Sequence, residues 1–129
     1  AYTALVIRAN VQPGERVLIH RGATSVGMAC ITIALHKGCQ VFTTVKSLKE
    51  KHVLQNRFPQ LKDDHFESYE DTSFKESFLY ATNGDGMDVI VNDLLNDKLQ
   101  ASVECLAENG RFLEIGKFHL ANDTNLGIQ

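Results

Sequence analysis

The chain has 129 residues, of which 43% are apolar and 22% charged, the composition of a single globular domain. A net charge of -3 argues against nucleic-acid binding, because phosphate recognition favours a basic surface, and no apolar run is long enough to span a membrane. Three cysteines, an odd number without close pairing, fit a reducing cytoplasmic setting better than a disulfide scaffold.

Short apolar runs alternate with helical segments along the chain. Strands are predicted at 16–20, 40–45, 65–66, 87–92 and 111–115. Helices are predicted at 26–37, 47–57, 71–80 and 98–106, with a loop at 83–86 and a turn at 109–110. Gly38 supplies the stop of the first helix, Ser47 can cap the second, and Phe58 ends the second because it precedes proline.

This alternation predicts an α/β fold, a Rossmann-like doubly wound and mostly parallel sheet with helices on both faces. The functional edge of such a sheet lies at the carboxyl ends of its strands. That edge is expected to carry residues 20–27, Val45-Lys46, Asn92-Asp93 and Gly116-Lys117.

The first strand leads into a glycine-bearing turn that opens a helix, an arrangement that presents N–H groups to a dinucleotide pyrophosphate. Gly22 and Gly27 occupy the first and third glycine positions of a G-x-G-x-x-G frame, and Thr24 occupies the second. A threonine hydroxyl could donate to a phosphate, although its Cβ pushes the ligand outward. The alternative is a strand-to-helix turn that keeps Gly27 only for packing. The candidate cofactor contacts in this turn are His20, Gly22, Ala23, Thr24, Ser25, Val26 and Gly27.

The end of the second strand lacks the acid that NAD-binding proteins place there for the ribose hydroxyls. Basic residues follow instead, at Lys46, Lys49, Lys51 and Arg57. Clustered cations favour the extra phosphate of NADP(H), because ammonium and guanidinium groups stabilise a dianion. The alternative is a solvated helix face.

Two further strand ends carry candidate residues. Lys117 follows Gly116, and its ammonium could protonate a carbanion or polarise a carbonyl if burial lowers its pKa. A surface lysine at a strand exit is the alternative. Asn92 could face the cofactor or satisfy a loop backbone.

Histidine and cysteine spacing gives no zinc pattern, so no metal is expected. Cys30 and Cys39 bracket one helix and are expected in the core. His20 is expected to end a buried strand with its ring bonded locally.

Four segments carry a resemblance to a known family: VLIHRGATSVGMACITIALHKGCQVFTTVKS, LQNRFPQL, DTSF and KLQASVECLAENGRFLEIGKF. They resemble the enoyl-reductase domain of animal-type fatty acid synthase. More broadly, the chain is similar to the cofactor-binding half of medium-chain reductases of the quinone-oxidoreductase kind. The similarity runs from Ala1 to about Leu120.

The resemblance implies a reaction in which NADPH delivers hydride to the β-carbon of an enoyl thioester held on an acyl carrier domain, without a metal. It implies Lys117 as the candidate proton donor, and cofactor contacts at residues 20–27 and 46–51. The expected partners are the acyl carrier domain and the other domains of the same synthase, whose parent is expected to be a homodimer.

The chain departs from the family pattern at three places. Residues 22–27 read GATSVG where the family resembles GSGGVG, and Glu50-Lys51 replaces a Lys-Arg pair, with Lys49 as a substitute one residue away. The chain also stops at Gln129, before later family elements. Because it starts without Met, we expect residues 1–129 to be a cofactor-binding subdomain excised from a longer enzyme, inactive alone. The alternatives are a cofactor-deficient pseudo-reductase scaffold and a quinone-oxidoreductase-like NADPH reductase.

Overall fold

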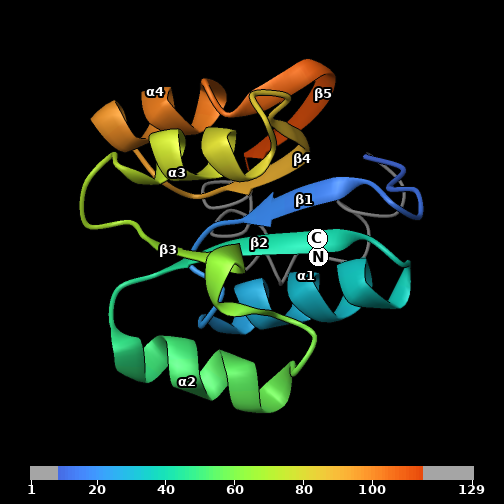
Figure 1. Ribbon diagram of the computed structural model, residues 1–129, viewed down its shortest axis with the longest axis vertical. Coiled ribbons are helices and arrows are strands. Elements are labelled where there is room, and N and C mark those ends of the chain that lie inside the picture. The colour runs from blue at the N-terminus through green and yellow to red at the C-terminus, as the bar shows by residue number, and fades with distance from the viewer. Residues whose placement is uncertain (1–8, 115–129) are drawn as a thin grey trace, which may run out of the picture.

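The computed structural model describes residues 9–114, in which strands and helices alternate (Figure 1). The strands are β1 (Arg16–Ile19), β2 (Gln40–Val45), β3 (Phe66–Ser68), β4 (Met87–Asn92) and β5 (Leu106–Glu114). The helices are α1 (Ser25–His36), α2 (Leu48–Arg57), the short 3-10 helix η2 (Asp63–His65), α3 (Phe74–Ala81) and α4 (Asn96–Val103). Within the described part, no helix is both long and apolar enough to cross a membrane.

The five strands form one parallel sheet in the order β3-β2-β1-β4-β5, which confirms the predicted Rossmann-like α/β fold. β1 lies at the centre, with Leu18 beside Phe42 of β2 and Ile90 of β4. The apolar run of β1 is buried on both faces, as expected for a central parallel strand.

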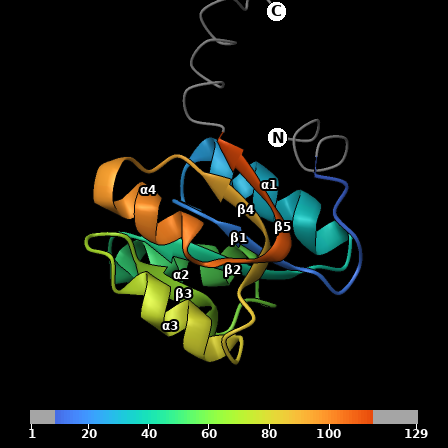
Figure 2. The same cartoon turned by 90° about the horizontal axis from the view of Figure 1, so that it is seen from above.

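Helices cover both faces of the sheet: α1 and α2 lie on one side, and α3 and α4 on the other (Figures 1 and 2). Alternate β1 side chains enter different cores, because successive strand residues point to opposite faces. Val17 and Ile19 pack with the first core, which includes Leu54 of α2, and Leu18 packs with Phe78 in the second. Cys30, Cys39 and Cys105 are buried and free, so the expectation of core positions for the first two is confirmed.

The predicted start and end of the second helix are confirmed. The Ser47 side chain accepts a hydrogen bond from the Glu50 N–H at 3.2 Å, and α2 ends before Phe58. Gly38 follows α1 with a φ of +85°, a left-handed conformation that glycine adopts without a steric penalty.

The last described helix and strand differ from the prediction. α4 ends at Val103 rather than residue 106, and β5 begins at Leu106 rather than 111. The reason is that the Cys105 carbonyl accepts the Met87 N–H at 2.8 Å, which draws this segment into the sheet. The predicted turn at 109–110 lies inside β5, where the register with β4 shifts and Asn109 has a φ of +67°.

The third long helix also starts later than predicted, at Phe74. Asp71 does not cap it directly. Its Oδ1 accepts hydrogen bonds from the Ser73 N–H at 2.9 Å and the Ser73 hydroxyl at 2.7 Å, which forms a local turn before the helix.

Candidate functional site

The carboxyl ends of all five strands meet at one edge of the sheet, because the strands are parallel. The chain builds β1, β2 and β3 outward on one side and then β4 and β5 on the other. The strand order therefore reverses between β1 and β4. In open α/β sheets, ligands bind in the crevice outside the strand ends at this reversal.

The turn after β1 is fixed by hydrogen bonds to the end of β2. The Arg21 N–H donates to Thr44 Oγ1 at 3.0 Å, and the Gly22 N–H donates to the Thr44 carbonyl at 3.1 Å. The Thr24 N–H and hydroxyl both donate to the Arg21 carbonyl, at 3.1 and 2.9 Å. Arg21 is thereby held at a φ of +53°, an uncommon conformation for a residue with a side chain.

Both positions in the turn require glycine, because neighbouring atoms lie too close to leave room for a Cβ. A Cβ on Gly27 would meet the Arg21 carbonyl oxygen and lie 2.7 Å from Gly22 Cα, so backbone would have to move. A Cβ on Gly22 would meet Thr43 Oγ1 and lie 3.0 Å from Ile31 Cδ1. Packing alone accounts for these glycines, so they do not by themselves distinguish the two interpretations of the turn.

The Thr24 hydroxyl, considered above as a phosphate donor, is engaged within the turn. Thr24 is the N-cap of α1, and its Oγ1 accepts the Gly27 N–H at 3.0 Å while donating to Arg21. Among the described residues, no hydrogen-bond partner is recorded for the Ser25 and Val26 N–H groups. These two amides and the positive end of the helix dipole can hold an anion.

His20 links three elements beneath the turn. Its Nδ1 lies 3.0 Å from Thr44 Oγ1, and its Nε2 lies 2.9 Å from Ser102 Oγ. The ring also packs edge-on against Phe74. Burial lowers the pKa of His20 to about 3, so the ring is neutral. The local bonding expected for the ring is present, and neither ring nitrogen is left for a ligand. Ala23 and Val26 likewise turn toward the core, where they pack against the α1 side of the sheet.

Lys46 and Lys49 are exposed at the carboxyl end of β2 and the first turn of α2. No ion pair to either is recorded among the described residues. The nearby acid, Glu50, accepts the Lys46 backbone N–H at 2.9 Å through Oε1. Glu50 therefore stabilises the start of α2 and leaves both ammonium groups available.

The other two predicted cations lie elsewhere. The Lys51 ammonium lies 3.4 Å from Asp63 and 5.7 Å from the Phe66 ring centroid, so it faces η2 and β3. Arg57 is the last residue of α2 and lies over the Phe58 ring. It is about 12 Å along the helix axis from Lys49. Gly116 and Lys117 lie outside the described residues.

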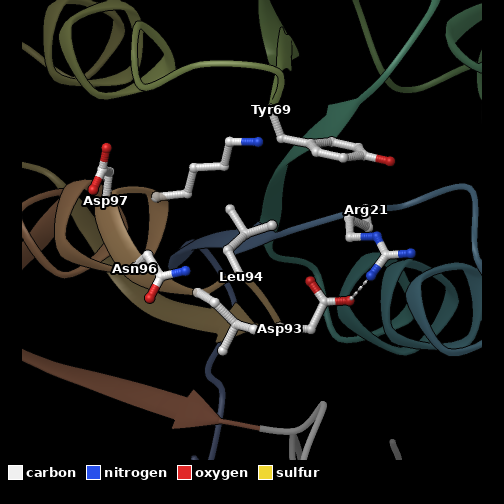
Figure 3. Close-up of a pocket in the computed structure, with 8 residues that line it drawn as sticks. Arg21, Tyr69, Asp93, Leu94, Asn96 and Asp97 are labelled. Atoms are coloured by element: carbon white, nitrogen blue, oxygen red, sulfur yellow. Dashed lines mark hydrogen bonds and ion pairs between the residues drawn. The ribbon is translucent and has the colours of Figure 1, made fainter.

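A cleft of about 580 Å³ opens at the reversal point (Figure 3). Its walls come from the ends of three strands and the start of α4: Arg21, Tyr69, Asp93, Leu94, Leu95, Asn96, Asp97 and Lys98. Arg21 Nη1 lies 3.1 Å from Asp93 Oδ2, so one ion pair joins the end of β1 to the end of β4. The Arg21 guanidinium also lies over the Tyr69 ring, 5.8 Å from its centroid.

Three buried side-chain atoms at this edge have no hydrogen-bond partner among the described residues: Arg21 Nε, Asn92 Oδ1 and Asp93 Oδ1. Asn92 meets one earlier expectation through its amide nitrogen, which donates to the Leu94 carbonyl at 3.0 Å and to Glu114 at 3.1 Å. Its oxygen stays unsatisfied. Buried polar groups are nearly always paired, so this cluster fits a site built to contact a polar ligand.

The carboxylate of the cleft is electrostatically perturbed. Burial raises the pKa of Asp93, and the facing Arg21 guanidinium opposes that rise. Arg21 and Asp93 lie in segments that the sequence placed on the functional edge, but neither they nor Tyr69 were singled out as contact residues. The sequence shows a cation, Arg21, after one strand and an anion, Asp93, after another. This pattern indicates a contact only when the two strands are known to be neighbours.

The chain is similar to segments of large fungal synthases. A highly reducing polyketide synthase of Penicillium roqueforti is 49% identical over 120 residues, which is 93% of this chain and 6% of that protein. The lovastatin diketide synthase of Aspergillus terreus is 44% identical over 128 residues, 99% of this chain and 5% of that protein. The chain thus spans only a small part of the curated relatives it matches.

A solved structure shares both the fold and part of the sequence. The nucleotide-binding subdomain of the enoylreductase domain of PpsC from Mycobacterium tuberculosis is 32% identical with a TM-score of 0.78, over 86% of this chain and 60% of that chain. No family model matches the chain. The likeness to enoyl reductases is confirmed. The assignment to animal-type fatty acid synthase is not confirmed, because the matching proteins are a highly reducing polyketide synthase and a lovastatin diketide synthase.

Proposed function

We propose that this chain is the NADP(H)-binding subdomain of an enoyl reductase within a multifunctional synthase. The observation that carries the proposal is the cluster of unsatisfied buried atoms beside the free amides of α1. Both lie at the reversal point of a parallel sheet, where dinucleotides bind. Similarity to the PpsC nucleotide-binding subdomain supports the same assignment.

The choice of NADP(H) over NAD(H) rests on the end of β2. In an NAD-binding domain, an acid at the end of β2 binds the ribose hydroxyls. The nearby acid in this chain, Glu50, instead accepts the Lys46 backbone N–H. Lys46 and Lys49 lie beside it without an ion-pair partner among the described residues, and their ammonium groups would pair with a 2′-phosphate. Lys51 and Arg57 contribute less, because Lys51 faces Asp63 and Arg57 lies at the far end of the helix.

The reaction proposed for the parent enzyme is reduction of a 2-enoyl thioester carried on an acyl carrier domain, with the cofactor supplying hydride to the β-carbon. The relatives favour a polyketide synthase as that parent. This chain's described residues would bind and orient the dinucleotide. Lys117 remains the proposed proton donor to the α-carbon, and homodimerisation of the parent and a cytoplasmic location remain proposals.

Equilibrium titration with NADPH and NADH, followed by nucleotide fluorescence, tests the cofactor assignment. We expect saturable binding of NADPH that is at least about tenfold tighter than that of NADH, because two lysines contact the added phosphate. The Lys46→Ala/Lys49→Ala variant should lose this preference while keeping its affinity for NADH.

The matched control is Lys37→Ala/Lys62→Ala, which removes two exposed lysines outside the proposed site. It should bind both nucleotides as the unmodified chain does. Equal affinity for NADPH and NADH in the unmodified chain would refute the NADP(H) preference. Absence of binding by either nucleotide would refute the cofactor assignment.

A pseudo-reductase scaffold is the second candidate, and the Thr24 cap is the observation that favours it. The cap engages the Gly27 N–H, which removes one amide from the pyrophosphate site. If the chain binds no nucleotide but Thr24→Gly/Ser25→Gly does, the scaffold assignment is correct. A quinone-oxidoreductase-like reductase would instead be indicated by NADPH-dependent reduction of a quinone.

A further inference from the structure

We infer that Arg21 is the pyrophosphate-binding side chain of this cleft and that Asp93 is a competing anion that a dinucleotide must displace. The inference deepens the proposed function and rests on it. It assigns a ligand contact to a residue outside the glycine frame and a restraining role to the residue opposite.

The backbone at Arg21 is held in place independently of its side chain. Its N–H and carbonyl are bound by Thr44 and Thr24, and these bonds fix the left-handed conformation. Arg21 opens the turn that leads into α1, and the first amides of that helix have no recorded partner among residues 9–114. The inference places a phosphate of the ligand between that helix end and the guanidinium.

The guanidinium is incompletely paired. Only Nη1 contacts Asp93, whereas Arg–carboxylate pairs are frequently bidentate. Arg21 Nε and Asp93 Oδ1 are both buried and without a partner in the described structure. The Tyr69 ring supports one face of the guanidinium, which leaves its edge to bind oxygen atoms.

An anionic ligand and Asp93 compete for the same cation. A pyrophosphate offers more charge and more acceptor oxygens than one carboxylate, so it can outcompete Asp93 for the guanidinium and also accept a hydrogen bond from Nε. The ion pair nonetheless lowers the fraction of molecules in which Arg21 is available, and the apparent affinity equals the intrinsic affinity multiplied by that fraction. Arg21 also compensates for the amide that the Thr24 cap withholds from the ligand.

The test compares NADPH and NADH affinities of Arg21→Gln and Asp93→Asn with those of the unmodified chain. Arg21→Gln should weaken binding of both nucleotides by the same factor, about tenfold or more, because both carry the pyrophosphate. Asp93→Asn should tighten binding of both by about threefold to tenfold. Arg21→Lys, which keeps the charge without the planar fork, should fall between the unmodified chain and Arg21→Gln.

The matched controls are Arg16→Gln and Asp85→Asn, which break a single ion pair at the opposite end of β1. They should leave both affinities unchanged, and circular dichroism of every variant reports folding. Unchanged affinity in Arg21→Gln and Asp93→Asn, with NADPH still bound, overturns this inference alone. A loss confined to NADPH assigns Arg21 to the 2′-phosphate and also overturns it. If the unmodified chain binds neither nucleotide, the proposed function fails as well.

Discussion

His20 makes the stability of this domain sensitive to mild acid. The ring is buried and neutral, with a pKa lowered to about 3 by burial, and it joins β1 to Thr44 of β2 and Ser102 of α4. In the unfolded chain a histidine has a pKa of about 6.5. Below that pH the unfolded state therefore binds a proton that the folded state rejects, so stability is complete above about pH 6.5 and is lost as the pH falls.

The magnitude follows from proton linkage. One histidine protonated only in the unfolded state lowers the free energy of unfolding by about 1.4 kcal/mol per pH unit well below pH 6.5. Between pH 7 and pH 5 the loss is about 2 kcal/mol. His20→Gln removes this titration, so its stability should decline less over that interval by about the same amount. The variant should be less stable at pH 7 by about 1–3 kcal/mol, because the two buried hydroxyls lose a partner.

Urea unfolding followed by circular dichroism at half-unit pH intervals measures both effects. His36→Gln is the control, because His36 is exposed and its removal should preserve the pH dependence of the unmodified chain. NMR titration of the unmodified chain gives a measurement that needs no variant: the His20 ring should not titrate above pH 4. Equal pH dependence in His20→Gln and the unmodified chain, or a His20 ring that titrates near pH 6.5, would refute the reasoning.

Two further substitutions test what stabilises the turn after β1 and the edge strand β5. Gly27→Ala should destabilise the fold by about 1–2 kcal/mol in urea unfolding, because the clash with turn backbone exceeds the gain in helix propensity, whereas exposed Thr32→Ala should change little. Arg111→Ala should cost roughly 1–2 kcal/mol, because its guanidinium pairs with both Glu15 oxygens at 2.7 and 2.8 Å and donates to the Ala9 carbonyl at 2.9 Å. Arg111→Lys should recover only part of that loss, and an unchanged denaturation midpoint in either Arg111 variant would contradict this role for the pair.

The fold was predictable because its signals are local. β-branched runs mark β2 and β4, and the cap at Ser47 and the stop at Phe58 place α2 to within a residue. The sequence did not reveal where β5 begins. Residues 106–110 lack a continuous apolar run, and they join the sheet through a long-range bond from Met87 to the Cys105 carbonyl.

The composition of the cleft was not predictable in the same way. Arg21 and Asp93 are 72 residues apart in the chain, and only the order of the strands makes them neighbours. The charge pattern likewise predicted Lys46, Lys49 and Lys51 as equivalent candidates for binding the 2′-phosphate. The structure separates them, because Lys51 turns toward Asp63. Side-chain partners depend on packing that neither spacing nor residue type determines.

Two of the residues at which the chain departs from the family pattern have backbone roles in this fold. Thr24 caps α1, and Glu50 holds the Lys46 N–H at the start of α2. Glu50 is therefore compatible with a phosphate at the neighbouring lysines. Thr24 is different, because its cap uses a donor that the glycine frame would leave to the ligand. The anion-binding capacity of this turn then depends more on a side-chain cation than on backbone amides, which makes the availability of Arg21 the property that decides whether the cleft is occupied.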